Sequence, residues 1–181
     1  MIRPKWRFPG KTLVRGLGGL CVLVWAGVSV ALAQPTSTLT DLAKDPAVKA
    51  ALDAVKANEP QTIEDQIRFC QIPAPSFKEE IRGKELEKVF QQVGLQNVRV
   101  DKVGNVLGEL RGAALHPHLV LAAHLDTVFP EGTDVRVKRE GNILRGPGIG
   151  DDCRGLAVLV SVAREMKKAN VRSKGTITFV A

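Results

Sequence analysis

The stretch LVLAAHLDTV at residues 119–128 and its sequel, GPGIGDDCRG at residues 146–155, decide the fold. The apolar run 119–123 predicts a buried strand that ends at His124. Side chains two positions apart on a strand point the same way, so His124 and Asp126 are expected to share one face. A neutral imidazole is a good zinc ligand, and a nearby carboxylate fixes its tautomer and raises its basicity.

The sequel combines a glycine-rich turn with two adjacent acids, Asp151 and Asp152, which precede an apolar helical pattern. Glycines let the backbone turn sharply, so the acids are expected at the start of this helix, facing the end of the strand. A histidine opposite carboxylates is what a metal site needs. Each part also has a structural interpretation, because single histidines are usually structural and Asp at a helix start is usually an N-cap. A phosphate-binding loop is disfavoured, since the motif residues are absent and two acids would repel phosphate.

In this order the motifs resemble those of the M20 metallopeptidases, a family of co-catalytic zinc aminopeptidases, carboxypeptidases and deacylases. The resemblance covers residues 62–181 and implies that His124 and Asp151 are metal ligands, with Asp151 bridging two zinc ions. It implies that Asp126 is the catalytic residue that orients His124, and it gives Asp152 no role as a ligand. It also implies a cis peptide bond between Asp151 and Asp152. Cobalt or manganese are alternatives to zinc, and no other cofactor is expected.

The family pattern continues beyond the last expected strand into a Glu-Glu pair, of which the first Glu is the general base and the second is a metal ligand. Here the strand GTITFVA at residues 175–181 is the last segment. Residues 61–181 are therefore expected to be the N-terminal part of a catalytic domain, truncated and inactive alone. The family's dimerisation domain would lie further downstream, so the resemblance allows a homodimer only for the full-length protein.

Residues 1–33 have the three parts of a secretory signal peptide: a basic start, the apolar run 17–33, and the sequence Ala-Leu-Ala at its end. Cleavage is expected after Ala33, followed by export to the periplasm or beyond. An uncleaved membrane anchor is the alternative, and no membrane partner is expected after cleavage. Five positive charges lie in this segment; without them the formal charge falls from +7 to about +2, which argues against a nucleic-acid partner.

Two cysteines, Cys70 and Cys153, remain after cleavage. An oxidising compartment allows them to pair, but two buried free thiols are predicted. His116 and His118 flank a proline in a loop and are interpreted as surface residues.

The remaining pattern alternates strands with helices and predicts an α/β fold, a mixed sheet flanked by helices. The resemblance refines this to the phosphorylase/hydrolase-like catalytic domain of zinc exopeptidases. Residues 34–60 are expected to form a tether, over 34–41, and an N-terminal helix. The other expected elements are helices from Thr62, at 78–93 and at 156–168, and hairpins turning at 104–105 and 140–141. Leu52 and Ile81 are expected to face the core.

The sequence thus predicts a metallopeptidase that hydrolyses amide bonds of small peptides or N-acyl amino acids through a water bridging two zinc ions. The helix and turn before the first hairpin most resemble those of tripeptide aminopeptidases. The nearest alternative is the M28 family, which also has a His-x-Asp motif and a later Asp-Asp; the expected hairpin at 135–144 favours M20. The alternative from another class is a non-catalytic exported domain that binds one metal through His124 and Asp151.

Overall fold

The computed structural model describes residues 39–181, so the predicted signal peptide at 1–33 lies outside the described residues. No helix in the described part of the chain is long and apolar enough to cross a membrane. The elements, in chain order, are α1 (Leu39–Leu42), α2 (Pro46–Ala57), α3 (Glu59–Cys70), α4 (Glu80–Val93), β1 (Gln96–Val100), β2 (Val106–Leu110), β3 (Leu119–Ala122), β4 (Lys138–Glu140), β5 (Ile143–Arg145), α5 (Cys153–Lys168) and β6 (Ile177–Val180).

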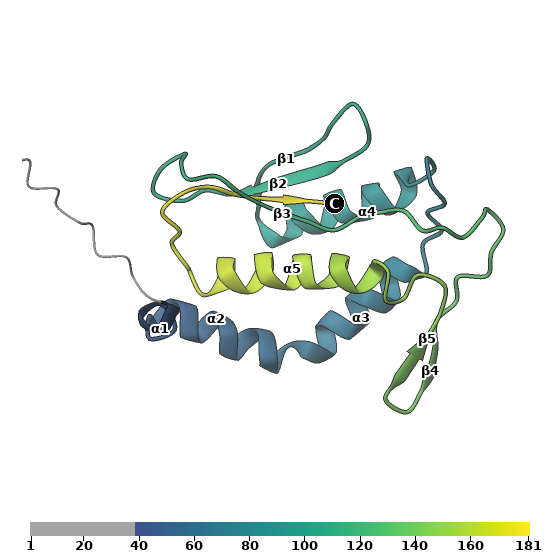
Figure 1. Cartoon of the computed structure of the whole chain (residues 1–181), viewed down its shortest axis with the longest axis horizontal. Coiled ribbons are helices and arrows are strands. Elements are labelled where there is room, and N and C mark those ends of the chain that lie inside the picture. The colour runs from purple at the N-terminus through teal and green to yellow at the C-terminus, as the bar shows by residue number, and fades with distance from the viewer. Residues whose placement is uncertain (1–38) are drawn as a thin grey trace, which may run out of the picture. The chain divides into compact units, whose positions relative to one another are not determined.

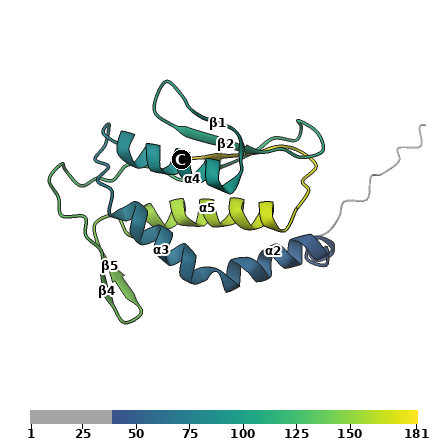
Figure 2. The same ribbon diagram turned by 180° about the vertical axis from the view of Figure 1, so that it is seen from behind.

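The main sheet is mixed, with the strand order β1-β2-β6-β3. β2 pairs antiparallel with β1 and with β6, whereas β3 runs parallel to β6. Helices α4 and α5 lie against the sheet, and α2 and α3 pack on the far side of α5 (Figure 1). The view from behind shows the same order of layers (Figure 2). The predicted fold class, a mixed sheet flanked by helices, is confirmed.

Helix α5 lies between the sheet and helices α2 and α3. Its apolar residues recur at helical spacing and form a face that can pack in the core. Leu156, Leu159, Val160 and Ala163 are buried, and Met166 of the same stripe is partly buried. They pack in one cluster with Phe179 of β6 and with residues of α3 and α4. The cluster fixes α5, and therefore the acids at its start, relative to the sheet.

Strand β3 is more exposed than the sequence indicates. Leu119 and Val120 were expected to be buried, but they are 52% and 57% exposed. The reason is that β3 is an edge strand, and within residues 39–181 it pairs only with β6. The apolar run correctly predicts a strand, but not how much of it is covered.

Two helices present a different face to the core from the expected one. Ile81 is 68% exposed, whereas its neighbour Arg82 is completely buried, because the buried face of α4 also contains Gly83 and Leu86. The charged residues of α4 are therefore not all exposed to solvent. On α2, Leu52 is exposed and only Ala51 is buried.

Other boundaries differ by a few residues. α3 begins at Glu59 rather than at Thr62, since Pro60 stands in its first turn, where proline is favoured. The end of the expected tether forms the single turn α1. The β1–β2 hairpin is confirmed, and β4 and β5 form the second predicted hairpin.

Candidate metal centre

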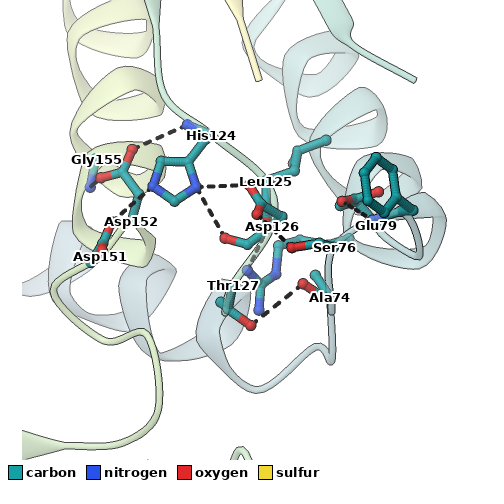
Figure 3. A network of polar contacts seen from close by, with 12 residues as sticks. Ala74, Ser76, Glu79, His124, Leu125, Asp126, Thr127, Asp151, Asp152 and Gly155 are labelled. Carbon is teal, nitrogen blue, oxygen red and sulfur yellow. Dashed lines mark hydrogen bonds and ion pairs between the residues drawn. The ribbon is translucent and has the colours of Figure 1, made fainter. Parts of the chain in front are cut away.

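His124 follows β3 immediately beyond the carboxyl end of the strand, where ligands of α/β sheets usually bind. Its ring lies between two carboxylates (Figure 3). Nδ1 is 3.0 Å from Oδ1 of Asp126, and Nε2 is 2.8 Å from Oδ1 of Asp151. The structure therefore brings together all three residues that the sequence singled out as catalytic or metal-binding.

Asp152 connects the start of α5 to the histidine. It is the N-cap of the helix, and Oδ1 accepts a hydrogen bond from the backbone N–H of Gly155 at 3.0 Å. Oδ2 accepts one from the backbone N–H of His124 at 3.1 Å. Both carboxylate oxygens of Asp152 therefore accept hydrogen bonds from backbone N–H groups. The peptide bond between Asp151 and Asp152 is cis, as predicted.

The glycine loop lies close to the segment after His124. Gly148 has φ +74°, and a Cβ at this position would lie 2.7 Å from Cγ2 of Thr127, so only glycine fits. Helix α3 holds the loop from the other side. Gln66 Nε2 donates to the carbonyl of Ile149 at 2.7 Å, and Cys70 Sγ donates to that of Pro147 at 3.1 Å.

The segment 73–76, to which the sequence assigned no role, supports Asp126. Ser76 Oγ donates to Oδ2 of Asp126 at 3.0 Å, and the N–H of Thr127 donates to the carbonyl of Ala74 at 2.8 Å. Asp126 thus uses one oxygen for the histidine and the other for Ser76. Neither contact has a signal in the sequence, since proline-rich turns are common.

The charges around the imidazole favour its protonated form. Burial lowers the pKa of His124, but hydrogen bonds with Asp151 and Asp126 and the charge of Asp152 outweigh it, so the pKa is above its usual value. Burial raises the pKa of Asp126, but hydrogen bonds from Ser76 and His124 outweigh it, so the pKa of this carboxyl is lowered. Asp126 is therefore an ionised partner for the imidazole at neutral pH.

The donor set fits a metal ion in type. Imidazole nitrogen and carboxylate oxygen are zinc ligands, and Nδ1 of His124 is bound by a carboxylate, as is usual when the other nitrogen ligates a metal. Among residues 39–181, however, no three His, Cys, Asp or Glu side chains gather where they could hold a metal. His124 and Asp151 are the two ligands that the described part of the chain would supply.

Cys70 and Cys153 are buried free thiols, as predicted. A hydrogen bond with Cys70, together with burial, raises the pKa of the Cys153 thiol. Cys153 follows the glycine loop directly, and its side chain is completely buried.

A cavity of about 890 Å³ opens beside the histidine. Its walls come from α4, from the turn between β1 and β2, and from the carboxyl ends of β3 and β6. His124, Asp126 and Asp152 line it at one end, and Phe77 lies in the same lining. The candidate site thus faces a cavity of the size that small-molecule ligands use.

Comparison with known proteins relates the chain to peptidases. The model of peptidase family M28 matches residues 105–181. Carboxypeptidase G2 of Pseudomonas sp. (strain RS-16) is 33% identical over 105 residues, which are 54% of this chain and 25% of the relative.

Solved structures share the fold. The aminopeptidase PepT of Bacillus cereus ATCC 10987 superimposes with a TM-score of 0.58 at 23% identity, over 68% of this chain and 36% of that protein. The YxeP protein of Bacillus subtilis, described as a dinuclear metal-binding peptidase from the M20 family, gives a TM-score of 0.52 at 18% identity, over 69% and 35% of the two chains. The chain therefore resembles metallopeptidases of the zinc type, and it spans about a third or less of their length.

Proposed function

We propose that this chain is the N-terminal part of the catalytic domain of an exported M20-type metallopeptidase that binds two zinc ions and hydrolyses amide bonds. The observation that carries the proposal is the geometry of His124, whose Nε2 is 2.8 Å from Oδ1 of Asp151 while Nδ1 is held by Asp126. A ring fixed at one nitrogen and facing a carboxylate with the other is prepared to share a cation.

Each described residue has a separate task in this proposal. His124 and Asp151 hold the metal, and Asp126 fixes the tautomer of His124 and increases its basicity. Asp152 fixes the backbone of His124 to the start of α5. Zinc, when bound, supplies Lewis-acid polarisation of the amide carbonyl. The general base and the remaining ligands are not among these residues.

The M20 family is favoured over M28 by the β4–β5 hairpin between the two motifs. The similarity of the fold to a peptidase described as M20 also supports it. The M28 family is the second candidate, because its model matches residues 105–181.

Small peptides or N-acyl amino acids are the proposed substrates. The large cavity beside His124 is the place for them. Export, cleavage after Ala33 and dimerisation of the full-length protein belong to the same proposal and rest on the sequence alone.

The first test is zinc binding by this chain, measured by calorimetry. His124→Ala is expected to abolish binding, whereas His116→Ala, which changes a histidine in an exposed loop, is expected to leave it unaltered. Equal metal content in the wild type and in His124→Ala would contradict the metal site altogether.

The second test separates the enzyme from a non-catalytic metal-binding domain. The protein encoded by the complete gene is assayed with a panel of dipeptides and N-acyl amino acids, with and without a chelator. Hydrolysis that the chelator stops supports the peptidase. Zinc binding without hydrolysis of any member supports the binding domain instead.

A further inference from the structure

Arg82 is the largest side chain that is completely buried in the described part of the chain. Its guanidinium donates to two backbone carbonyls at short range: Nη1 to Leu125 at 2.6 Å and Nη2 to Ile72 at 2.6 Å. Nε adds a bond to the same Ile72 carbonyl at 3.1 Å, and Nη2 a longer one to Cys70 at 3.5 Å. Within residues 39–181, no carboxylate forms an ion pair with it.

A buried cation without a carboxylate partner is costly unless polar groups replace its hydration. Here carbonyl dipoles do so, and the planar fork of arginine allows it to reach two chain segments at once. The hydrogen bonds fix both segments relative to α4. The two segments that Arg82 joins are therefore informative.

Both segments lead directly to the candidate metal centre. Leu125 lies between His124 and Asp126, so its carbonyl belongs to the backbone that carries both side chains. Ile72 begins the turn from which Ala74 binds Thr127 and Ser76 binds Asp126. Figure 3 shows Leu125 and Ala74 on either side of the Asp126–Ser76 contact.

We propose that Arg82 is a positioning residue of the candidate metal centre. By joining the carbonyls of Leu125 and Ile72, its guanidinium holds Asp126 against Nδ1 of His124 and so directs Nε2 towards Asp151. The inference rests on the proposed function, because it assigns Arg82 to the same site. Arg82 forms no hydrogen bond with His124 or Asp151 in the described part of the chain, and its hydrogen bonds reach the site through backbone carbonyls.

The test compares Arg82→Met with the matched control Arg164→Met. Arg164 is also largely buried, but it pairs with Asp65 at 2.8 Å and lies about 18 Å further along α5 than Asp152, at 1.5 Å per residue. Thermal unfolding, zinc affinity and the side-chain NMR signals of His124 are measured for both variants. A purely structural role lowers the melting temperature alike in both and leaves the His124 signals of folded protein unchanged.

We expect both substitutions to lower the melting temperature, but only Arg82→Met to shift and broaden the His124 signals. It should also weaken zinc binding about 10-fold or more, the usual effect of losing support around a metal ligand. Unchanged His124 signals and zinc affinity in folded Arg82→Met would overturn the proposal.

If Arg82→Met does not fold, Arg82→Lys tests the positioning role of Arg82 instead. Lysine retains the charge but has no fork, so stability should partly return while the His124 signals remain shifted. His124 signals identical to those of the wild type in Arg82→Lys would overturn the proposal. If the wild-type chain binds no zinc, the metal site fails, whereas the NMR comparison without metal still decides the role of Arg82.

Discussion

The two carboxylates that contact His124 are supported very differently. Asp126 is 38% exposed and accepts a hydrogen bond from Ser76 in addition to its contact with His124. The backbone on both sides of it is fixed, because Arg82 binds the carbonyl of Leu125 and the N–H of Thr127 binds that of Ala74. Asp151 is 87% exposed, and its side-chain contact in the described structure is the one to His124. Asp126 is therefore fixed by several contacts within the described chain, whereas the side chain of Asp151 is accessible to solvent. The difference shows that the chain fixes one carboxylate partner of the imidazole more firmly than the other.

The largest loss of stability is expected from Asp152→Ala, because Asp152 connects the start of α5 to the backbone of His124. The substitution removes the N-cap of α5 and leaves the N–H of His124 without its acceptor. Loss of a cap costs about 1 kcal/mol, and loss of a second hydrogen bond adds about 1 kcal/mol, so unfolding in urea should show a decrease of roughly 2 kcal/mol.

Asp45→Ala is the matched control for this variant. Asp45 caps α2 through the N–H groups of Ala47 and Val48, far from the histidine in sequence, and within residues 39–181 its side chain forms no other hydrogen bond. It should cost about 1 kcal/mol or less. Equal losses in Asp152→Ala and Asp45→Ala would mean that the bond to His124 contributes nothing.

A smaller, pH-dependent effect is expected from Asp151→Asn. The pKa of His124 is raised in the folded protein: burial lowers it, but the contacts with Asp151 and Asp126 outweigh burial. The stability gained from protonated His124 is therefore complete below the unfolded value of about 6.5 and is lost as the pH rises through the folded pKa. Asp151→Asn should destabilise the protein at pH 5.5 more than at pH 8.5, by less than about 1 kcal/mol, because the pair is exposed.

Asp126→Asn and Asp151→Asn are also compared by NMR titration of His124. Both substitutions should lower the pKa of His124, but only Asp126→Asn should also disturb the ring orientation, because it changes the side-chain partner of Nδ1 and leaves only the backbone carbonyl of residue 126, 3.0 Å away, unaltered. An unaltered pKa in Asp151→Asn would show that this exposed carboxylate turns away from the ring in solution.

The sequence predicted those parts of the molecule that depend on local pattern. The strand before His124, the core face of α5 and the turns at the hairpins follow from hydrophobic spacing and glycine positions. The pairing of His124 with Asp126 and Asp151 was also predicted, the first from strand geometry and the second from the family resemblance. Features that depend on packing between distant segments were not.

Arg82 and Ser76 are the clearest of these missed features. In the sequence, Arg82 is one charge among many on an amphipathic helix, and only the packing of α4 against the segment after β3 buries it. Ser76 meets Asp126 across 50 residues of chain, which no periodicity indicates. The exposure of Val120 was missed for the same reason, since the position of a strand within its sheet is a long-range property.

The smallest change in stability is expected from a substitution of Phe77, the residue after Ser76. Phe77 has φ +68°, in the left-handed region that costs a non-glycine residue about 1 kcal/mol, and the residue is 98% exposed. Its N–H donates to Oε1 of Glu79 at 2.6 Å, a bond that does not depend on the side chain. Phe77→Gly should therefore stabilise the chain, by about 0.5 kcal/mol after the greater freedom of glycine in the unfolded state is included. Asn170→Gly, at φ +53°, should change stability less, because asparagine tolerates this region. A loss of stability in Phe77→Gly would show instead that the ring packs in solution, and the segment before α4 would then be held by an apolar contact as well as by Arg82 and Ser76.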